Sequence, residues 1–174
     1  NVGGDLNLNA SQTLANVLSG NGTVTTDSAI TLTGANSFTG SHVIDDAASL
    51  TVSSAKNLGL DQGSTASVRI VKNGNLILND LRGTLANTLS GEGNVLLKNG
   101  SQTVLTGSND AFDGTYALSN ASTLTVSELS QLGNTDTAVS LTDADSQLNL
   151  TNYNSQGAFT NNVTGNGQLV LSGA

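Results

Sequence analysis

Short segments in which apolar and polar residues alternate recur along the whole chain. Each covers about three to five residues and places two apolar side chains on one face and a polar side chain on the other, the pattern of a half-buried β-strand. No apolar pattern at helical spacing runs for three turns. The alternation predicts an all-β chain of very short strands, at Leu6–Asn9, Thr23–Thr25, Ile30–Thr33, Leu50–Val52, Val68–Ile70, Leu76–Leu78, Leu124–Val126 and Leu148–Leu150.

Three blocks of the chain return later in the same order and at a nearly constant offset. Agreement over three ordered blocks is not expected by chance. The period is about 72 residues, which gives about 2.4 copies and indicates a repeat architecture. The repeated blocks are Leu14–Gly22, which returns at Leu85–Gly93 and more loosely at Phe159–Gly167; Leu32–Gly40, which returns at Leu105–Gly114 with one inserted residue; and Ser49–Ser53, which returns at Thr123–Ser127.

A finer spacing lies within the long repeat. When eight aliphatic positions are treated as equivalent, the steps from Leu6 to Leu171 average about 24 residues, a length typical of stacked repeat units. One long repeat would therefore be three turns of a stack of similar units, since short fixed periods are typical of such architectures. The eight positions are Leu6, Ile30, Leu50, Leu76, Val104, Leu124, Leu148 and Leu171.

With only short strands available, the stacked unit is predicted to be one coil of a parallel β-helix. Each coil would turn through about three strands, and successive coils would pair in parallel about 4.8 Å apart. We expect about seven coils, with Leu50, Leu76, Val104, Leu124 and Leu148 inside. A β-sandwich is the rival fold, but it gives no reason for a long repeat made of three equal steps.

Asparagine recurs at equivalent positions of the repeat, and two interpretations stay open. The side-chain amides would form ladders from coil to coil, as in cross-β stacks, or the residues would only tolerate tight turns. The positions are Asn16, Asn87 and Asn161 in one block and Asn36 and Asn109 in another.

Composition supports the fold class and narrows the chemistry. Asn, Thr, Ser and Gly, all poor helix formers, number 22, 22, 21 and 20 and make up 85 of the 174 residues. The regular aliphatic alternation favours order over disorder. Thirteen acidic residues against five basic ones leave a net charge of −8, so a basic nucleic-acid surface is absent. Without cysteine there is no disulfide framework or thiolate metal site, and no apolar run approaches the ~20 residues of a membrane helix.

One composite motif recurs through the long repeats: a Gly-x-Gly strand, a Leu-Thr-Gly segment followed by Asn, an aromatic residue and Gly, and a Leu-Thr-Val strand. The first copy comprises Gly20–Val24, Ile30–Gly40 and Ala48–Val52; the second keeps Gly91–Gly93, Leu105–Gly107, Asn109, Phe112–Gly114 and Leu124–Val126; the third keeps Gly165–Leu169 and Leu171–Ala174. The motif resembles the passenger-associated transport repeat of bacterial autotransporter passenger domains, also described as an autotransporter-associated β-strand repeat.

The resemblance covers most of the chain and departs from the family pattern at two places. Phe38 and Phe112 stand where the family often has Tyr, and we expect both to pack in the core. Ala48-Ser49 and Ser122-Thr123 stand where it often has Gly-Thr. These exchanges do not alter the strand pattern. The resemblance implies a right-handed single-stranded β-helix, type V secretion across the outer membrane, and a location at the bacterial cell surface or outside the cell.

His42 is the only histidine, and Asp45 and Asp46 follow it. A Ser-His-Asp hydrolase would need one of the 21 serines against this ring, and the chain has no Gly-x-Ser-x-Gly turn. We expect His42 to lie in a strand with its ring on the outside and to have no catalytic role.

Carboxylate pairs occur at Asp45/Asp46, Asp110/Asp113 and Asp143/Asp145. Glycoside hydrolysis needs two carboxyl groups about 5 to 9.5 Å apart across a cleft, whereas aspartate at turns bonds its own backbone. Calcium needs only oxygen ligands, but the GGxGxD nonapeptide and the EF-hand loop are both missing. The basic residues, which polysaccharide lyases of this shape tend to use, do not cluster with the acids: Lys56, Arg69, Lys72, Arg82 and Lys98. We therefore predict no enzyme, no catalytic or cofactor-binding residue, no cofactor and no metal site.

The expected protein is a single β-helix segment, residues 1–174, of a longer passenger, with repeats at roughly 6–75 and 76–147 and a partial copy at 148–174. We expect it to act in adhesion, aggregation or biofilm formation as an adhesin. Its partners would be a host-surface glycan or protein, or the same protein on neighbouring cells, without nucleic acid, and with membrane contact only through a translocator barrel that this chain does not contain. The alternative is a passive stalk or folding-promoting core that presents a distal domain, and a polysaccharide-active enzyme is the less favoured third hypothesis.

Overall fold

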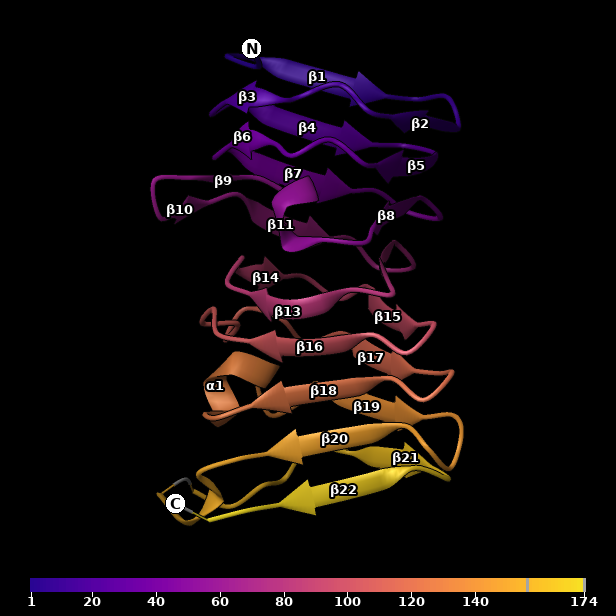
Figure 1. Cartoon of the computed structure of the whole chain (residues 1–174), viewed down its shortest axis with the longest axis vertical. Coiled ribbons are helices and arrows are strands. Elements are labelled where there is room, and N and C mark those ends of the chain that lie inside the picture. The colour runs from indigo at the N-terminus through magenta and orange to yellow at the C-terminus, as the bar shows by residue number, and fades with distance from the viewer. Residues whose placement is uncertain (156, 174) are drawn as a thin grey trace.

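The chain winds into a parallel β-solenoid of about eight turns, which confirms the predicted all-β coil architecture (Figure 1). A computed structural model describes residues 1–155 and 157–173. The two termini lie at opposite ends of the stack. The number of turns is close to the seven expected, and the right-handed sense stays a prediction.

One sheet of eight parallel strands runs the whole length of the solenoid. Each turn adds one strand, so that the order in the sheet follows the order in the chain. The strands are β2 (Gln12–Leu14), β5 (Ala29–Leu32), β8 (Ser49–Val52), β12 (Asn75–Asn79), β15 (Asn94–Lys98), β17 (Thr115–Leu118), β19 (Ala138–Leu141) and β21 (Val163–Gly165).

Two five-stranded parallel sheets form two further sides of the solenoid, one along each half. The first is β1 (Asp5–Leu8), β4 (Thr23–Thr26), β7 (Ser41–Ile44), β11 (Ser67–Ile70) and β14 (Leu89–Ser90). The second, at the front of the lower half of Figure 1, is β13 (Arg82–Leu85), β16 (Gln102–Leu105), β18 (Thr123–Val126), β20 (Gln147–Leu150) and β22 (Gln168–Leu171). The two sheets overlap midway along the stack, where the turn β11–β12–β13 and the turn β14–β15–β16 each give a strand to all three sheets.

Smaller elements close the corners of the turns. They are the parallel pair β3 (Ser19–Gly20) and β6 (Ser37–Phe38), the antiparallel hairpin β9 (Leu60–Asp61) and β10 (Ser64–Thr65), the 3-10 helices η1 (Ala55–Asn57) and η2 (Tyr153–Ser155), and the one-turn helix α1 (Leu129–Leu132). Among the described residues, no helix is long and apolar enough to cross a membrane.

The interior is a stack of aliphatic side chains in register from turn to turn. In the long sheet the paired inward positions follow one another at a mean step of about 22 residues, a period typical of solenoid repeats. These positions are Ile30, Leu50, Leu76, Val95, Tyr116, Val139 and Val163. Leu50, Leu76, Leu124 and Leu148 are fully buried, and so are Phe38 and Phe112, as predicted.

The predicted interior position of Val104 is wrong. Its side chain is 38% exposed on the outside of β16. Thr103 takes the inward place instead, because it pairs with the inward Leu124 of β18 and is 1% exposed. A shift of one residue along a strand moves every side chain to the opposite face, and a count of the mean spacing does not detect such a shift.

The long repeat is three turns plus one additional strand, rather than three turns. The repeat-related segments β4 and β15 lie in different sheets, the first five-stranded sheet and the eight-stranded sheet. In the same way β8 lies in the eight-stranded sheet and its counterpart β18 in the second five-stranded sheet. Because turns of about 22 residues do not divide a period of about 72 evenly, each copy begins about a third of a turn further around the solenoid.

Four of the five repeated asparagines, Asn36, Asn87, Asn109 and Asn161, bond through their side chains to the main chain of neighbouring turns, whereas Asn16 lies exposed in a bend. The Asn36 side chain accepts a hydrogen bond from the Leu18 N–H at 2.8 Å and donates to the Asn57 carbonyl. Asn109 does the same with the Leu89 N–H and the Gln131 carbonyl, at 2.8 and 2.6 Å.

The ladder and turn interpretations both hold at other asparagines. Asn99 donates to the Asn79 side chain at 2.6 Å, one turn away. Asn73, Asn99 and Asn120 have positive φ angles of 65°, 56° and 55°, which asparagine tolerates better than most residues. The composition showed that asparagine is important in this fold. The sequence pattern did not distinguish the asparagines that bond to the main chain of a neighbouring turn from those that pair with another asparagine or adopt a positive φ angle.

Candidate functional site

His42 lies inside the solenoid, which corrects the expectation of an outward ring. It is fully buried between the paired inward residues Val24 and Val68, and its ring meets Phe38 edge-on at a centroid distance of 5.1 Å. Nε2 lies 2.6 Å from the Leu58 carbonyl oxygen and must donate, because a carbonyl only accepts. Burial lowers the pKa of His42, and the hydrogen bond to Leu58 offsets only part of this effect. No described hydrogen bond links the ring to a serine or an aspartate.

Tyr116 is the counterpart of His42 in the second copy of the repeat. It is fully buried, meets Phe112 edge-on at 5.0 Å and donates from its hydroxyl to the Leu132 carbonyl at 2.6 Å. Burial raises the pKa of Tyr116 well above its ordinary value. Both copies thus bury an aromatic pair and bond a corner carbonyl, which favours a structural role for His42.

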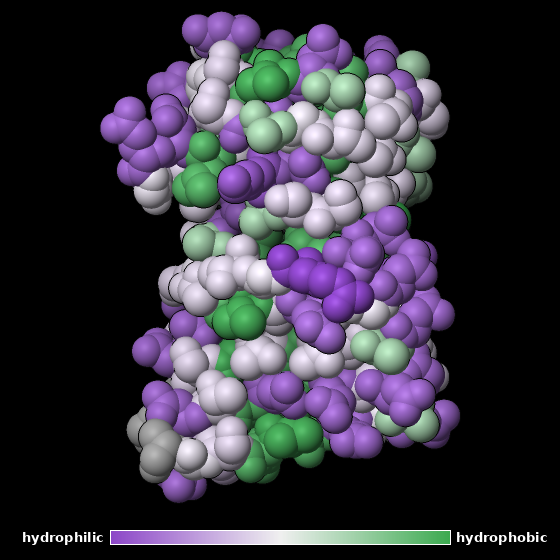
Figure 2. Space-filling view, viewed as in Figure 1, coloured by the Kyte–Doolittle hydropathy of each residue, from purple (hydrophilic) through white to green (hydrophobic). Residues whose placement is uncertain are grey.

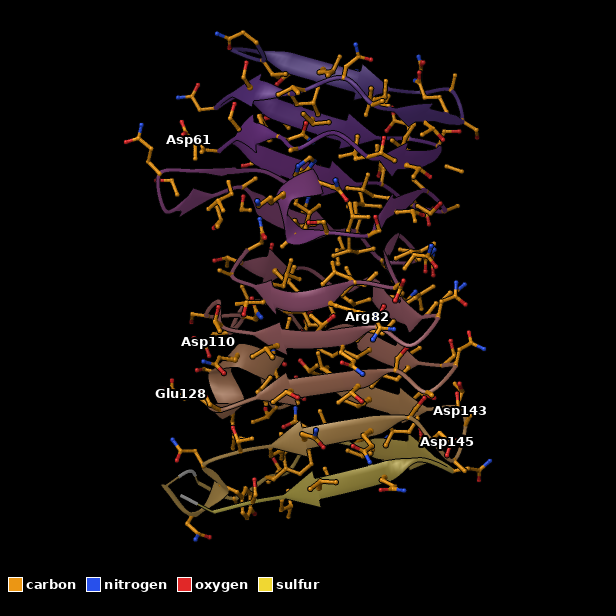
Figure 3. All side chains as sticks on the ribbon, in the orientation of Figure 1. Asp61, Arg82, Asp110, Glu128, Asp143 and Asp145 are labelled. Carbon is orange, nitrogen blue, oxygen red and sulfur yellow. The ribbon has the colours of Figure 1, made fainter. Side chains whose placement is uncertain are left out.

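The carboxylate pairs lie in surface turns at the edges of the strands. Figure 3 shows Asp110 at one edge and Asp143 and Asp145 at the other. The Asp45 carboxylate accepts a hydrogen bond from the backbone N–H of Asp46 at 2.9 Å, and Asp143 accepts one from Asp145 at 3.2 Å. This is the turn chemistry of aspartate, in which the paired residues do not face each other across a cleft.

Asp143 also joins two neighbouring turns. Its carboxylate accepts hydrogen bonds from the Ser146 hydroxyl at 2.9 Å and from the Ala121 N–H at 3.3 Å. Desolvation raises the pKa of Asp143, but these bonds and those from the N–H groups of Asn120 and Asp145 outweigh it and leave the pKa below its ordinary value. Within the described part of the chain, no three His, Cys, Asp or Glu residues gather closely enough to hold a metal ion.

The outer surface of the eight-stranded sheet, here named the long face, has no carboxylate in its strands. None of its eight strands contains Asp or Glu, and Lys98 is the only charged residue in them. The central outward row combines hydroxyl and small apolar side chains, with two larger ones midway: Thr13, Thr31, Thr51, Ile77, Leu96, Ala117, Ser140 and Thr164.

The outer surface of the second five-stranded sheet is also free of carboxylates but shorter. Gln147 donates to the Gln168 side chain at 3.0 Å, and Val104 and Val170 are each 38% exposed. Arg82 begins this sheet and pairs with Asp80 at 2.8 Å, with both side chains more than half exposed. Figure 2, which views this side, shows mostly polar and neutral residues with apolar ones in separate patches.

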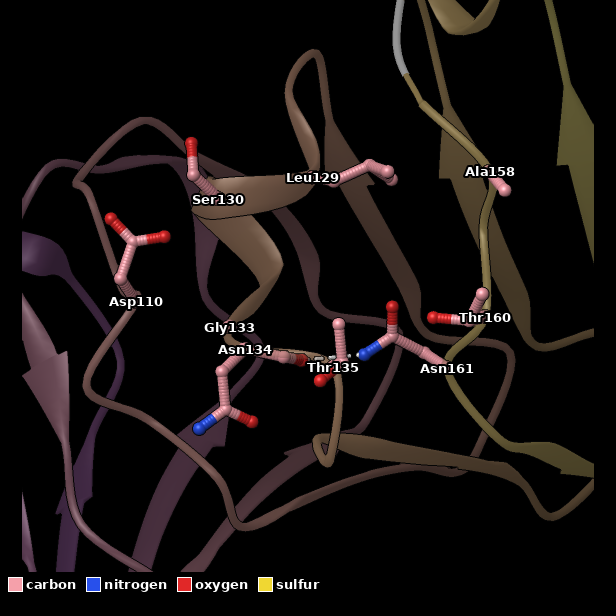
Figure 4. Close-up of a pocket in the computed structure, with 9 residues that line it drawn as sticks. All are labelled: Asp110, Leu129, Ser130, Gly133, Asn134, Thr135, Ala158, Thr160 and Asn161. Atoms are coloured by element: carbon pink, nitrogen blue, oxygen red, sulfur yellow. Dashed lines mark hydrogen bonds between the residues drawn. The ribbon is translucent and has the colours of Figure 1, made fainter.

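A pocket of about 350 Å³ opens at the corner beside α1 (Figure 4). Its walls come from α1, from the segment that follows it and from residues 158–161. Leu129 and Ala158 supply apolar surface, while Asp110, Asn134 and Thr160 supply polar groups. It combines apolar and hydrogen-bonding surface in one concave site, as small-molecule sites do.

Only Asp110 of the pocket was a candidate from the sequence, and Asp113, its expected partner, does not line it. Leu129, Asn134 and Thr160 were missed because they are ordinary residue types with no motif. The available signal was the departure from the repeat: between Asn109 and Phe112 the second copy has one residue more than the first copy, and from Gly133 to Val139 it has three residues fewer than from Gly59 to Val68.

Comparisons with protein-family models, with curated protein sequences and with solved structures found no match to this chain. The fold and the two features above, the long face and the corner pocket, are therefore the basis for a functional proposal.

Proposed function

We propose that this chain is a surface-displayed β-helical segment of an autotransporter passenger that acts in bacterial adhesion, aggregation or biofilm formation. The long face carries the proposal, because it is the one sheet surface that continues through all the turns. The repeat resemblance supports the secretion route and the cell-surface location.

The charge distribution favours contact between like copies through the long face. The protein carries a net charge of −8, yet the eight strands of the face contain no carboxylate. Two such faces can approach without the direct like-charge contacts that cost several kcal/mol in an interface. Thr51 and Ser140 are half-buried outward residues that offer hydroxyl groups to a facing surface. Each contact is weak, so the affinity comes from repetition along the rod.

Bead aggregation with charged variants tests this proposal. Beads coated with the chain should cluster, and the double variant Thr51→Asp, Ser140→Asp should reduce clustering at least about tenfold by placing like charges face to face. Thr25→Asp is the matched control, because Thr25 is a half-buried outward threonine of β4, outside the long face.

Each outcome distinguishes the two roles. Loss of clustering only in the long-face variant supports adhesion through that face. Undiminished clustering in both variants, or none with the native chain, favours the passive stalk that presents a distal domain.

A further inference from the structure

The corner pocket lies where the second copy of the repeat departs from the first copy. In the first copy the corner after Gly59 carries the hairpin β9–β10. In the second copy the shorter segment after Gly133 makes no hairpin, and Asp110, from the segment that is one residue longer than its counterpart, lines the same pocket. Both departures from the repeat therefore meet at this one pocket.

The pocket's carboxylate is held in place and keeps one free oxygen. Oδ2 of Asp110 accepts a hydrogen bond from the Ser108 hydroxyl at 2.9 Å, while Oδ1 bonds to none of the described residues. The Asp110 side chain is exposed, and Figure 4 shows it at one end of the pocket. An ionised carboxylate only accepts hydrogen bonds, so its ligand must donate.

The pocket's amide supplies the complementary donor. The Asn134 side-chain oxygen accepts from the Asp136 N–H at 2.9 Å, which orients the amide. Its nitrogen bonds to no described residue and remains a donor. The Asn134 backbone is fixed on both sides: its N–H donates to the Phe112 carbonyl at 3.0 Å, and its carbonyl accepts from the Asn161 amide at 2.7 Å.

Apolar side chains line another part of the pocket, away from Asp110 and Asn134 (Figure 4). The half-buried Leu129 packs against the core and, with Ala158, lines the pocket. The volume of about 350 Å³ is at the small end of the range for ligand sites, which suits a single ring rather than a long chain.

We propose that the corner pocket binds one neutral pyranose residue of a glycan. Neighbouring sugar hydroxyls both donate and accept, so one donates to Asp110 and the next accepts from Asn134. The C–H face of the ring then covers Leu129 and Ala158. The carboxylate of Asp110 would repel an anionic sugar. A single carboxylate also supplies too few oxygen ligands for Ca²⁺, which takes six to eight. None of the pocket residues belongs to the strands of the long face. Sugar binding in the pocket is therefore a separate proposal from self-contact through the long face, and the two can be tested independently.

Titration of the isotopically labelled chain with single sugars tests the site. The probes are the methyl α-glycosides of glucose, galactose and mannose and N-acetylglucosamine, each added up to about 100 mM. At least one should give saturable shifts in the backbone and side-chain amides of Asn134 and in the backbone amides of Leu129 and Ala158. Asp110→Asn should weaken binding at least about tenfold, because a hydrogen bond to a charged group is lost.

The controls make each outcome decisive. Asp113→Asn removes another exposed, neighbouring carboxylate that lies outside the pocket, and it should leave the affinity unchanged. An unchanged melting temperature shows that the variants are folded. No saturable shift with any of the four sugars, shifts away from the pocket, equal losses in the two variants, or the same shifts with Ca²⁺ alone would each overturn the proposal. Bead clustering by the Asp110→Asn variant should stay native, so a failure here is distinct from failure of the long-face proposal.

Discussion

At the scale of single residues, the comparison of His42 with Tyr116 shows how the repeat tolerates chemical change. Both rings pack against a phenylalanine and both donate to the carbonyl of a leucine, at 2.6 Å in each case. Tyrosine stays neutral over the physiological range. A solvent-exposed histidine, in contrast, becomes protonated in mild acid. In the folded chain Nδ1 of His42 is buried without a partner in the described structure.

The stability of the chain should therefore fall in mild acid because of His42. Burial lowers the pKa of the folded-state ring below its ordinary 6.5. Below about pH 6.5 the histidine of the unfolded chain binds a proton, whereas the buried ring of the folded chain stays unprotonated. The free energy of unfolding should therefore drop by about 1.4 kcal/mol per pH unit until the folded ring titrates. Above that pH the contribution is constant.

Denaturant titrations between pH 7 and pH 5 measure this slope, and His42→Tyr should remove it. The substitution copies the residue of the second repeat. Its larger ring is expected to cost no more than about 1–3 kcal/mol at pH 7. The nearest inward residues on the adjoining strands, Val24 and Val68, carry no charge, so a slope that persists in the variant would assign the titration to the carboxylates instead.

At the scale of elements, two aliphatic residues of the second five-stranded sheet should behave differently. Leu124 is fully buried and Val104 is 38% exposed. Leu124→Ala should cost about 2–5 kcal/mol through lost burial and a cavity. Val104→Ala should cost less than about 1 kcal/mol, and Asp145→Asn in its exposed turn should stay within about 0.5 kcal/mol. Urea titrations of the three variants provide the comparison, and equal costs for Leu124 and Val104 would contradict the observed register.

The periodicity of the sequence explains which features of the strands could be predicted and which could not. Alternation located the strands, and the long repeat predicted stacking, because both depend on spacing along the chain. Neither records which side of the solenoid a strand occupies, so Leu50 and Leu124 were treated as one column although they lie in different sheets. Thr103 was missed as an inward residue because a buried threonine breaks the aliphatic pattern.

The candidate site was less predictable because it arises at corners rather than in strands. The turn carboxylates follow from composition. The corner pocket depends instead on three separate segments that meet only in the folded chain, at Asp110, at α1 and at residues 158–161.

At the scale of the whole molecule, the net charge of −8 opposes association even though the long face lacks carboxylates. The acidic residues labelled in Figure 3 lie at the edges of the strands, so they face those of a second rod at some distance. Salt screens such exposed charges, with a Debye length that falls from about 30 Å at 0.01 M to about 8 Å at 0.15 M. Self-association should therefore strengthen over this range. Sedimentation velocity at the two ionic strengths measures it, and a monomer at both would support the stalk role.

Disulfide trapping between single-cysteine variants tests the use of the long face most directly, because the native chain has no cysteine to interfere. Thr51→Cys places a thiol in the central row of the long face, and Thr25→Cys places one at a matched outward position of β4. Under mild oxidation at about 0.15 M salt, the Thr51→Cys chain should form covalent dimers at least about tenfold faster, since effective concentration rises only where the two faces meet. Equal rates for the two variants, or faster dimerisation through Thr25→Cys, would contradict contact through the long face.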